Sequence, residues 1–165
     1  MYRLLRHALL AATVLSGIPA ASAADRVALV IGNSAYRAQN PLANPVNDAA
    51  DVSAMFRRLG FDVVEGLDLD GPALKAKIKE FRDRLEGGAL AVFYYSGHGI
   101  QVDGRNFIIP IDARIDKPDD VALETVDMDL VLQMMRADDR VNVIVLDACR
   151  SHPFARSVRR AGKGS

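Results

Sequence analysis

The sequence predicts an α/β fold, a three-layer α/β/α sandwich with a mostly parallel sheet. Short apolar runs occur at residues 27–31, 89–95 and 141–146 and predict buried strands. The run at residues 89–95 has no polar alternation, which is typical of a strand covered on both faces. Stretches with apolar residues three or four positions apart separate these runs and predict helices. Because strands and helices alternate along the chain, we expect parallel strands with helices on both faces of the sheet.

The first 24 residues have the composition of a secretory signal peptide. Arg3 and Arg6 give a basic start, residues 8–18 form an apolar core, and residues 21–23 read Ala-Ser-Ala, a pattern typical of a cleavage site. The apolar part is too short to span a bilayer comfortably. We therefore expect residues 1–24 to be removed and the protein to be secreted or periplasmic, with no stable membrane insertion. An uncleaved membrane anchor is the alternative.

The rest of the chain is long enough for one domain with a substantial core. The first 24 residues hold two of the 21 basic residues and none of the 21 acidic ones, so the remainder has a formal charge of −2. This balance gives no indication of nucleic-acid binding. The single cysteine, Cys149, has no disulfide partner within the chain. In an oxidising compartment it is either buried and inert or kept for its reactivity.

The first elements follow directly from this pattern. The strand at residues 27–31 leads into a polar loop at residues 33–45. Asn47 can then cap a helix that ends at Gly60. The apolar residues of this helix recur at helical spacing: Ala49, Val52, Phe56 and Leu59. A second strand is predicted at residues 61–67.

The middle of the chain repeats the order of helix and strand. A second helix begins at Pro72, and the pair Gly87-Gly88 closes it. Its apolar face consists of Leu74, Ile78, Phe81 and Leu85. The apolar run at residues 89–95 follows as a buried strand.

A hairpin, a helix and a strand complete the predicted elements. Residues 99–110 predict a β-hairpin that turns at Asp103-Gly104. A third helix is predicted at about residues 128–136. The buried strand at residues 141–146 comes last.

A histidine and a cysteine follow two of these strands. His98 lies between two glycines just past the strand at residues 89–95, and Cys149 lies just past the strand at residues 141–146. Parallel strands end at the same edge of a sheet and lie about 4.8 Å apart, so the imidazole and the thiol are expected to approach each other. Taken alone, a histidine at such a position favours the alternative, a structural residue with satisfied hydrogen bonds.

A cysteine and a histidine in contact form a nucleophile and its proton carrier. The thiolate attacks a carbonyl carbon, and the histidine handles the protons of the thiol and of the leaving amine. The backbone N–H groups of Gly99 and Cys149 are candidate donors of an oxyanion hole.

At this point the sequence resembles the caspase-like cysteine peptidases, and among them the metacaspase and bacterial orthocaspase branch. The resemblance covers Arg26 to about Phe154. Its segments, in order, are ALVIGNSAY, NPVNDAADVSAMFRRLGF, VFYYSGHG, FIIPIDA and VIVLDACR. Cys149 follows His98 by 51 residues, close to the caspase spacing of about 50. The resemblance implies a cysteine-type endopeptidase in which His98 and Cys149 are the catalytic dyad.

The resemblance also implies the substrate class. Caspases carry glutamine at the position of Asp147, whereas metacaspase-like enzymes carry aspartate there and cleave proteins or peptides after arginine or lysine. Asp48 matches a second carboxylate of the same substrate-binding pocket. Two carboxylates in one pocket favour a cation through charge-assisted hydrogen bonds. Alternatively, Asp48 is an acid that favours the first turn of a helix, and Asp147 is a strand-end acid bound by nearby N–H groups.

No metal or other cofactor is expected. The acidic stretch at residues 111–129 could coordinate calcium through its oxygens, as in some metacaspases. Those enzymes carry another aspartate shortly after the catalytic cysteine, and here no acid follows Cys149, which favours a solvated acidic loop. His152 is expected to be a solvated side chain, because nothing near it has metal-ligand spacing.

Caspase-like domains continue past the catalytic cysteine with two more strands and a helix, whereas 16 residues follow Cys149 here. We therefore expect residues 25–155 to be the large-subunit part of a catalytic domain that lacks its C-terminal strands. Residues 156–165 are expected to be a basic linker or a truncated tail, in a fragment or a truncated product. The alternative function is a non-catalytic caspase-like binding or signalling module, inactive because the second half of the domain is absent.

Overall fold

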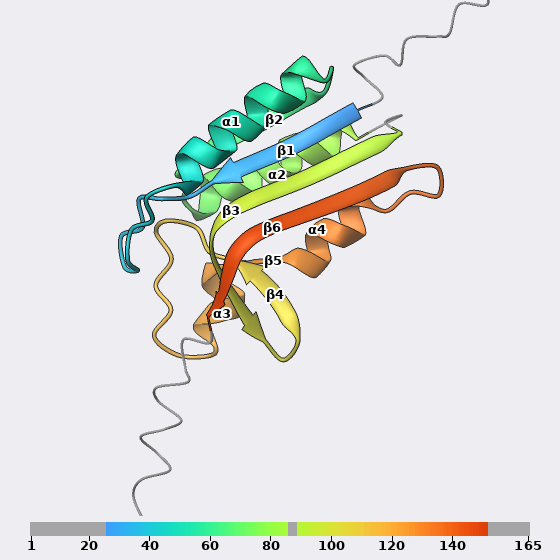
Figure 1. The fold of residues 1–165 in the computed structure, drawn as a ribbon. Coiled ribbons are helices and arrows are strands. Elements are labelled where there is room, and N and C mark those ends of the chain that lie inside the picture. Colours follow the sequence, from blue (N-terminus) through green and yellow to red (C-terminus); the bar gives the residue numbers. More distant parts are fainter. Residues whose placement is uncertain (1–25, 86–88, 152–165) are drawn as a thin grey trace, which may run out of the picture.

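The computed structural model describes residues 26–85 and 89–151, which form a six-stranded sheet with helices on both faces (Figure 1). The strands are β1 (Arg26–Gly32), β2 (Asp62–Leu67), β3 (Leu90–Val102), β4 (Arg105–Ile108), β5 (Val126–Asp127) and β6 (Val141–Ser151). The helices are α1 (Pro45–Arg58), α2 (Gly71–Arg84), α3 (Asp120–Glu124) and α4 (Met128–Met135).

The long strand β3 organises the sheet. It pairs in parallel with β1 on one side and with β6 on the other, and β2 pairs in parallel with β1. The second half of β3 pairs antiparallel with β4, which in turn pairs antiparallel with β5. The predicted α/β fold with a mostly parallel sheet is therefore confirmed.

The two faces of the sheet bury different sets of side chains because side chains alternate along a strand. On one face, Ala28, Val30 and Val92 pack with Ala49 of α1. On the other face, residues of β1 and β3 pack against α2 and α4. This second and larger core includes Leu29, Phe93, Leu74, Phe81 and Val131. The predicted layers on both faces are thus present.

Strand β6 shows the same alternation with only one face covered. Ile144, Leu146 and Ala148 pack against the core that α2 and α4 share. The side chains between them are exposed, with Val141, Val143 and Val145 at 63%, 39% and 42% of full exposure. The prediction that residues 141–146 form a buried strand is therefore wrong for this face, because these valines point away from the core that Ile144 and Leu146 join. We call these three residues the valine stripe.

The β3–β4 hairpin confirms the predicted turn at Asp103-Gly104. Both residues have positive φ, 50° and 79°, as the tight turn of a two-residue hairpin requires. The predicted cap of the first helix at Asn47 is wrong, because α1 begins at Pro45. Proline suits the first position of a helix, since its φ is fixed and it has no N–H that would need a partner there.

Two short elements were not predicted, α3 and the two-residue strand β5. The proposed signal peptide (1–24), the closing pair Gly87-Gly88, His152 and the basic tail (156–165) lie outside the described residues. Among the residues that are described, no helix has the length and apolar character needed to cross a membrane.

Candidate active site

His98 and Cys149 occupy matching positions on neighbouring strands. β3 carries His98, β6 carries Cys149, and the two residues are Cα partners in the parallel ladder. Because adjacent strands lie about 4.8 Å apart, the main chain holds the two residues side by side. The sheet thus brings together the histidine and the cysteine that the sequence singled out, and their catalytic role stays a prediction.

Both residues lie inside their strands. The expected placement just past residues 89–95 and 141–146 is wrong, because β3 continues to Val102 and β6 continues to Ser151. The second half of β3 pairs with β6 as far as Ile100 and, from Gly99 onward, with β4, which the hairpin folds back beside it. In Figure 1, β6 bends sharply at its carboxyl end alongside β3. Strand pairing, rather than loop geometry, therefore sets the positions of both residues.

The imidazole of His98 is held on two sides. Its Nε2 lies 2.7 Å from the main-chain oxygen of Asn40, and its ring packs against the ring of Tyr36 with centroids 4.4 Å apart. A carbonyl oxygen can only accept a hydrogen bond, so Nε2 must carry a hydrogen in this contact. In the neutral ring, Nδ1 is then the basic nitrogen.

The main chain of His98 is held by two tyrosines. Its N–H donates to the Tyr36 hydroxyl at 2.7 Å, and its carbonyl oxygen accepts from the Tyr95 hydroxyl at 2.7 Å. The two hydroxyl oxygens are 3.1 Å apart and hydrogen-bonded. Burial raises the pKa of Tyr36 and raises the pKa of Tyr95 well above its usual value of 10, so both hydroxyls keep their hydrogens at neutral pH.

Gly97 allows the two tyrosines to approach. A Cβ at this position would lie 2.6 Å from the hydroxyl oxygens of both Tyr36 and Tyr95, far closer than ordinary contact. The glycine provides space for side chains, while β3 continues through it without a turn.

A pocket of about 340 Å³ opens beside His98. Its lining consists of Ala38, Gln39, Asn40, His98, Gly99, Ile100 and Ile109. Gln39 donates from Nε2 to the carbonyl oxygen of Ala113 at 3.0 Å, and its Oε1 is buried without a hydrogen-bond partner among the described residues. Gly99 lies within β3, where Ile108 and Arg150 are its ladder partners. The assignment of Gly99 and Cys149 to an oxyanion hole stays a prediction.

The two predicted pocket carboxylates act on the same tyrosine, Tyr94. Burial raises the pKa of the Tyr94 hydroxyl, and the negative charges of Asp147 and Asp48 raise it further. Asp48 lies half-buried in the first turn of α1, as the dipole alternative also requires. Asp147 is exposed on β6, where the Ser96 hydroxyl lies 3.5 Å from its Oδ2. Within the described part of the chain, neither carboxylate forms an ion pair.

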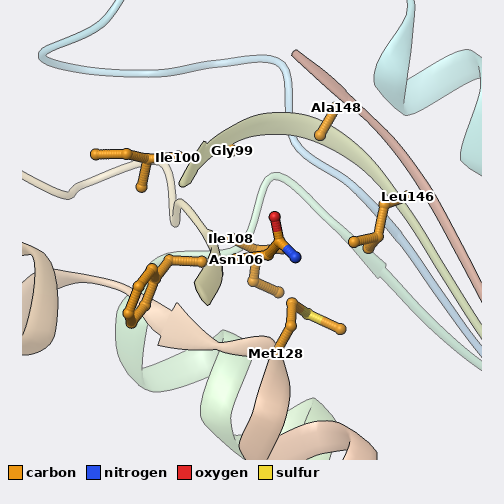
Figure 2. Close-up of a pocket in the computed structure, with 8 residues that line it drawn as sticks. Gly99, Ile100, Asn106, Ile108, Met128, Leu146 and Ala148 are labelled. Atoms are coloured by element: carbon orange, nitrogen blue, oxygen red, sulfur yellow. The ribbon is translucent and has the colours of Figure 1, made fainter. Parts of the chain in front are cut away.

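The opposite face of the two strands is closed. Figure 2 shows Leu146 and Ala148 of β6 facing Met128 and Asn106 around a cavity of only about 30 Å³. This cavity lies on the α4 side of the sheet and is too small for a peptide. A larger cleft of about 700 Å³ between α2, α4 and β4 includes neither His98 nor Asp147 in its lining. The open side of the site is therefore the face that carries Asp147.

The acidic stretch at residues 111–129 forms local hydrogen bonds. Asp120 accepts from the N–H groups of Asp116 and Lys117 at 3.0 Å. The side chains described by the structure include no group of three or more histidine, cysteine, aspartate and glutamate residues that could hold a metal ion.

Sequence reasoning missed the partners of His98. Asn40 acts through its main-chain carbonyl, which has no signature in the residue type. Tyr36 lies in the loop after β1, and the shared carboxyl edge of β1 and β3 is the one signal that could have placed it near His98.

Comparisons with known proteins agree with this architecture. Residues 25–164 match the family described as Caspase domain. The human mucosa-associated lymphoid tissue lymphoma translocation protein 1 is 35% identical over 130 residues, and its mouse homologue is 34% identical over 130 residues. The match covers 78% of this chain and 15% of each relative, so the chain spans about 15% of the length of these relatives. The match to the family over residues 25–164 shows that this chain belongs to the caspase-domain family.

Proposed function

We propose that this chain is the catalytic part of a cysteine endopeptidase that cleaves proteins or peptides after arginine or lysine. The observation that carries the proposal is the pairing of His98 with Cys149 in the β3–β6 ladder. Membership of the caspase-domain family supports it, because this family includes peptidases that use these two residue types.

In the proposed reaction, the Cys149 thiolate attacks the carbonyl carbon before the scissile bond. The carbon–nitrogen bond breaks, and the leaving amine takes a proton from the imidazolium of His98. Water then attacks the resulting thioester while His98 accepts a proton from it, and the acid product leaves as the sulfur is released. The hydrogen bond from Nε2 to the Asn40 carbonyl leaves Nδ1 for these transfers.

The proposed specificity rests on Asp147 and Asp48. Both negative charges act on the Tyr94 hydroxyl, which supports a common acidic surface on the open face. A guanidinium or ammonium group there would gain a charged partner, worth about 2 kcal/mol. An acidic substrate side chain would be repelled instead.

Covalent labelling tests the proposal directly. A peptidyl acyloxymethyl ketone ending in arginine should label Cys149, as located by mass spectrometry, and Cys149→Ala should remove the label. His98→Ala should slow labelling by about a hundredfold while the circular dichroism spectrum is unchanged. Equal labelling of heat-unfolded protein would show an ordinary thiol and contradict the proposal. Faster labelling by the matching aspartyl ketone would overturn the pocket assignment and leave the dyad in place.

A second candidate function is a non-catalytic binding module. The valine stripe favours it, because exposed apolar residues in one row favour association with another surface. This candidate predicts that Cys149 reacts no faster than a thiol in an unfolded peptide.

We also propose that the protein is exported and acts outside the cytoplasm. The composition of residues 1–24 supports this location. No metal or other cofactor has a role in the proposed reaction.

A further inference from the structure

The hydrogen bonds around His98 form a closed ring of three members. The His98 N–H can only donate and the His98 carbonyl can only accept. Tyr36 accepts from the N–H, and Tyr95 donates to the carbonyl. The remaining hydrogen, that of Tyr36, therefore points to the oxygen of Tyr95 at 3.1 Å. This assignment gives the Tyr95 hydrogen to the shorter of its two carbonyl contacts, 2.7 Å to His98 against 3.1 Å to Ile109.

Each tyrosine has further contacts that fix its place. Tyr95 is fully buried in the core, and its hydroxyl also lies 3.1 Å from the carbonyl oxygen of Ile109. Tyr36 is 5% exposed, and its ring packs against the imidazole of His98. The Tyr36 hydroxyl, in addition, binds the main chain of the same histidine. The ring of hydrogen bonds thus joins the rigid core to a half-buried histidine.

We propose that Tyr36 and Tyr95 are positioning residues that hold His98 in the orientation in which Nε2 bonds to the Asn40 carbonyl. Their catalytic consequence rests on the proposed peptidase function. Neither tyrosine exchanges a proton with substrate. They fix the peptide unit from which the imidazole projects, and Tyr36 also limits the rotation of the imidazole ring. Errors of a fraction of an ångström in such a group slow catalysis, because the productive arrangement becomes rarer.

Removal of single hydroxyl groups tests the proposal. Tyr36→Phe and Tyr95→Phe keep both rings and remove one oxygen each. Thr125→Val is a matched control, because it also removes a buried hydroxyl that donates to a carbonyl, that of Val121. Folding of all variants is checked by thermal unfolding, and if one tyrosine variant does not fold, the other carries the test.

Two readouts separate positioning from general stability. In kinetics with an arginyl peptide, each tyrosine variant should have a kcat about tenfold lower than the wild type and a KM within about twofold of it. The loss of kcat in the double variant should be much smaller than the product of the two single losses, because both hydroxyls belong to the same ring of hydrogen bonds. In ¹⁵N-histidine spectra, the His98 signals, identified by their loss in His98→Gln, should shift away from the form with hydrogen on Nε2. Thr125→Val should change neither readout.

The nitrogen spectra need no peptidase activity, so the two proposals can fail separately. If the wild-type chain cleaves nothing, the proposed function is overturned. A shift in the spectra of the tyrosine variants of that same chain would still support the positioning role. Cleavage by the wild type, with kcat and spectra in both tyrosine variants equal to those of Thr125→Val, would overturn the positioning role.

Discussion

Replacement of Gly97 by alanine should destabilise the domain strongly. The added Cβ would lie 2.6 Å from the hydroxyl oxygens of Tyr36 and Tyr95 and 2.9 Å from Cζ of Tyr95, whereas ordinary contacts begin at 3.4 Å. Each oxygen would have to retreat by about 0.8 Å to reach an ordinary contact. The hydrogen bonds to His98 are 2.7 Å long and would break under such a displacement.

The expected loss is the sum of two effects, to which the strain of a non-glycine residue at the Gly97 φ of 157° adds. Two or three buried hydrogen bonds contribute about 1 kcal/mol each, and overpacking of a closed site adds about 1–3 kcal/mol. The free energy of unfolding should therefore fall by about 3–6 kcal/mol, a large part of the stability of an ordinary domain. Urea denaturation followed by circular dichroism measures this quantity.

The chain offers a matched control and a rescue. Gly71→Ala adds the same methyl group at the start of α2, where its nearest neighbour is the Asp112 carboxylate at 3.8 Å, and should change stability little. Gly97→Ala should cost less when Tyr36 and Tyr95 are both phenylalanine. The rescue is partial, because the Cζ contact stays. A loss below about 1 kcal/mol, or no rescue at all, would refute this reasoning.

Three further outcomes are expected. Asp147→Asn should lower kcat/KM for arginyl substrates by about 30-fold, corresponding to about 2 kcal/mol, with unchanged unfolding; equal activity would remove Asp147 from the pocket. Burial raises the pKa of Tyr95 and Tyr36 above 10, so the unfolded chain loses phenol protons first. The free energy of unfolding should thus fall above pH 10 by up to about 1.4 kcal/mol per pH unit for each tyrosine, and urea melts of Tyr95→Phe should show a shallower fall. Expression with the leader should give a mature N-terminus at Ala24 or Asp25, and a cytoplasmic protein that starts at residue 1 would contradict export.

Much of the fold could be predicted because its elements are long and regular. The buried strands β1 and β3 show as uninterrupted apolar runs, and α2 buries three apolar residues on one face, with Leu85 following at its C-cap. The elements α3 and β5 have five and two residues, too few for a period to be recognised. The start of α1 was missed by three residues because Asn47 resembles a cap, whereas Asn44 is the cap and Pro45 opens the helix.

The candidate site was predictable in its residue types and less so in its geometry. Glycines on both sides of His98 suggest a turn, but the segment is a strand that pairs with β6 as far as Ile100 and, from Gly99 onward, with β4. The pairing with β4 depends on the hairpin, which a local pattern around His98 does not contain. The partners Asn40 and Tyr36 come from a loop 58 and 62 residues earlier in the chain, so contacts distant in sequence decide the orientation of the imidazole.

The alternation of side chains along β6 protects the site against slippage. If β6 slid by one residue along β3, Ala148 or Arg150 would stand opposite His98 in place of Cys149, and the valine stripe would turn inward in place of Ile144 and Leu146. The side chains that β6 packs against the core therefore fix the register of β6, and the register decides which residue pairs with His98. A polar residue at position 146 would weaken the preference for this register. A fraction of the molecules would then be folded with another residue in place of Cys149 opposite His98.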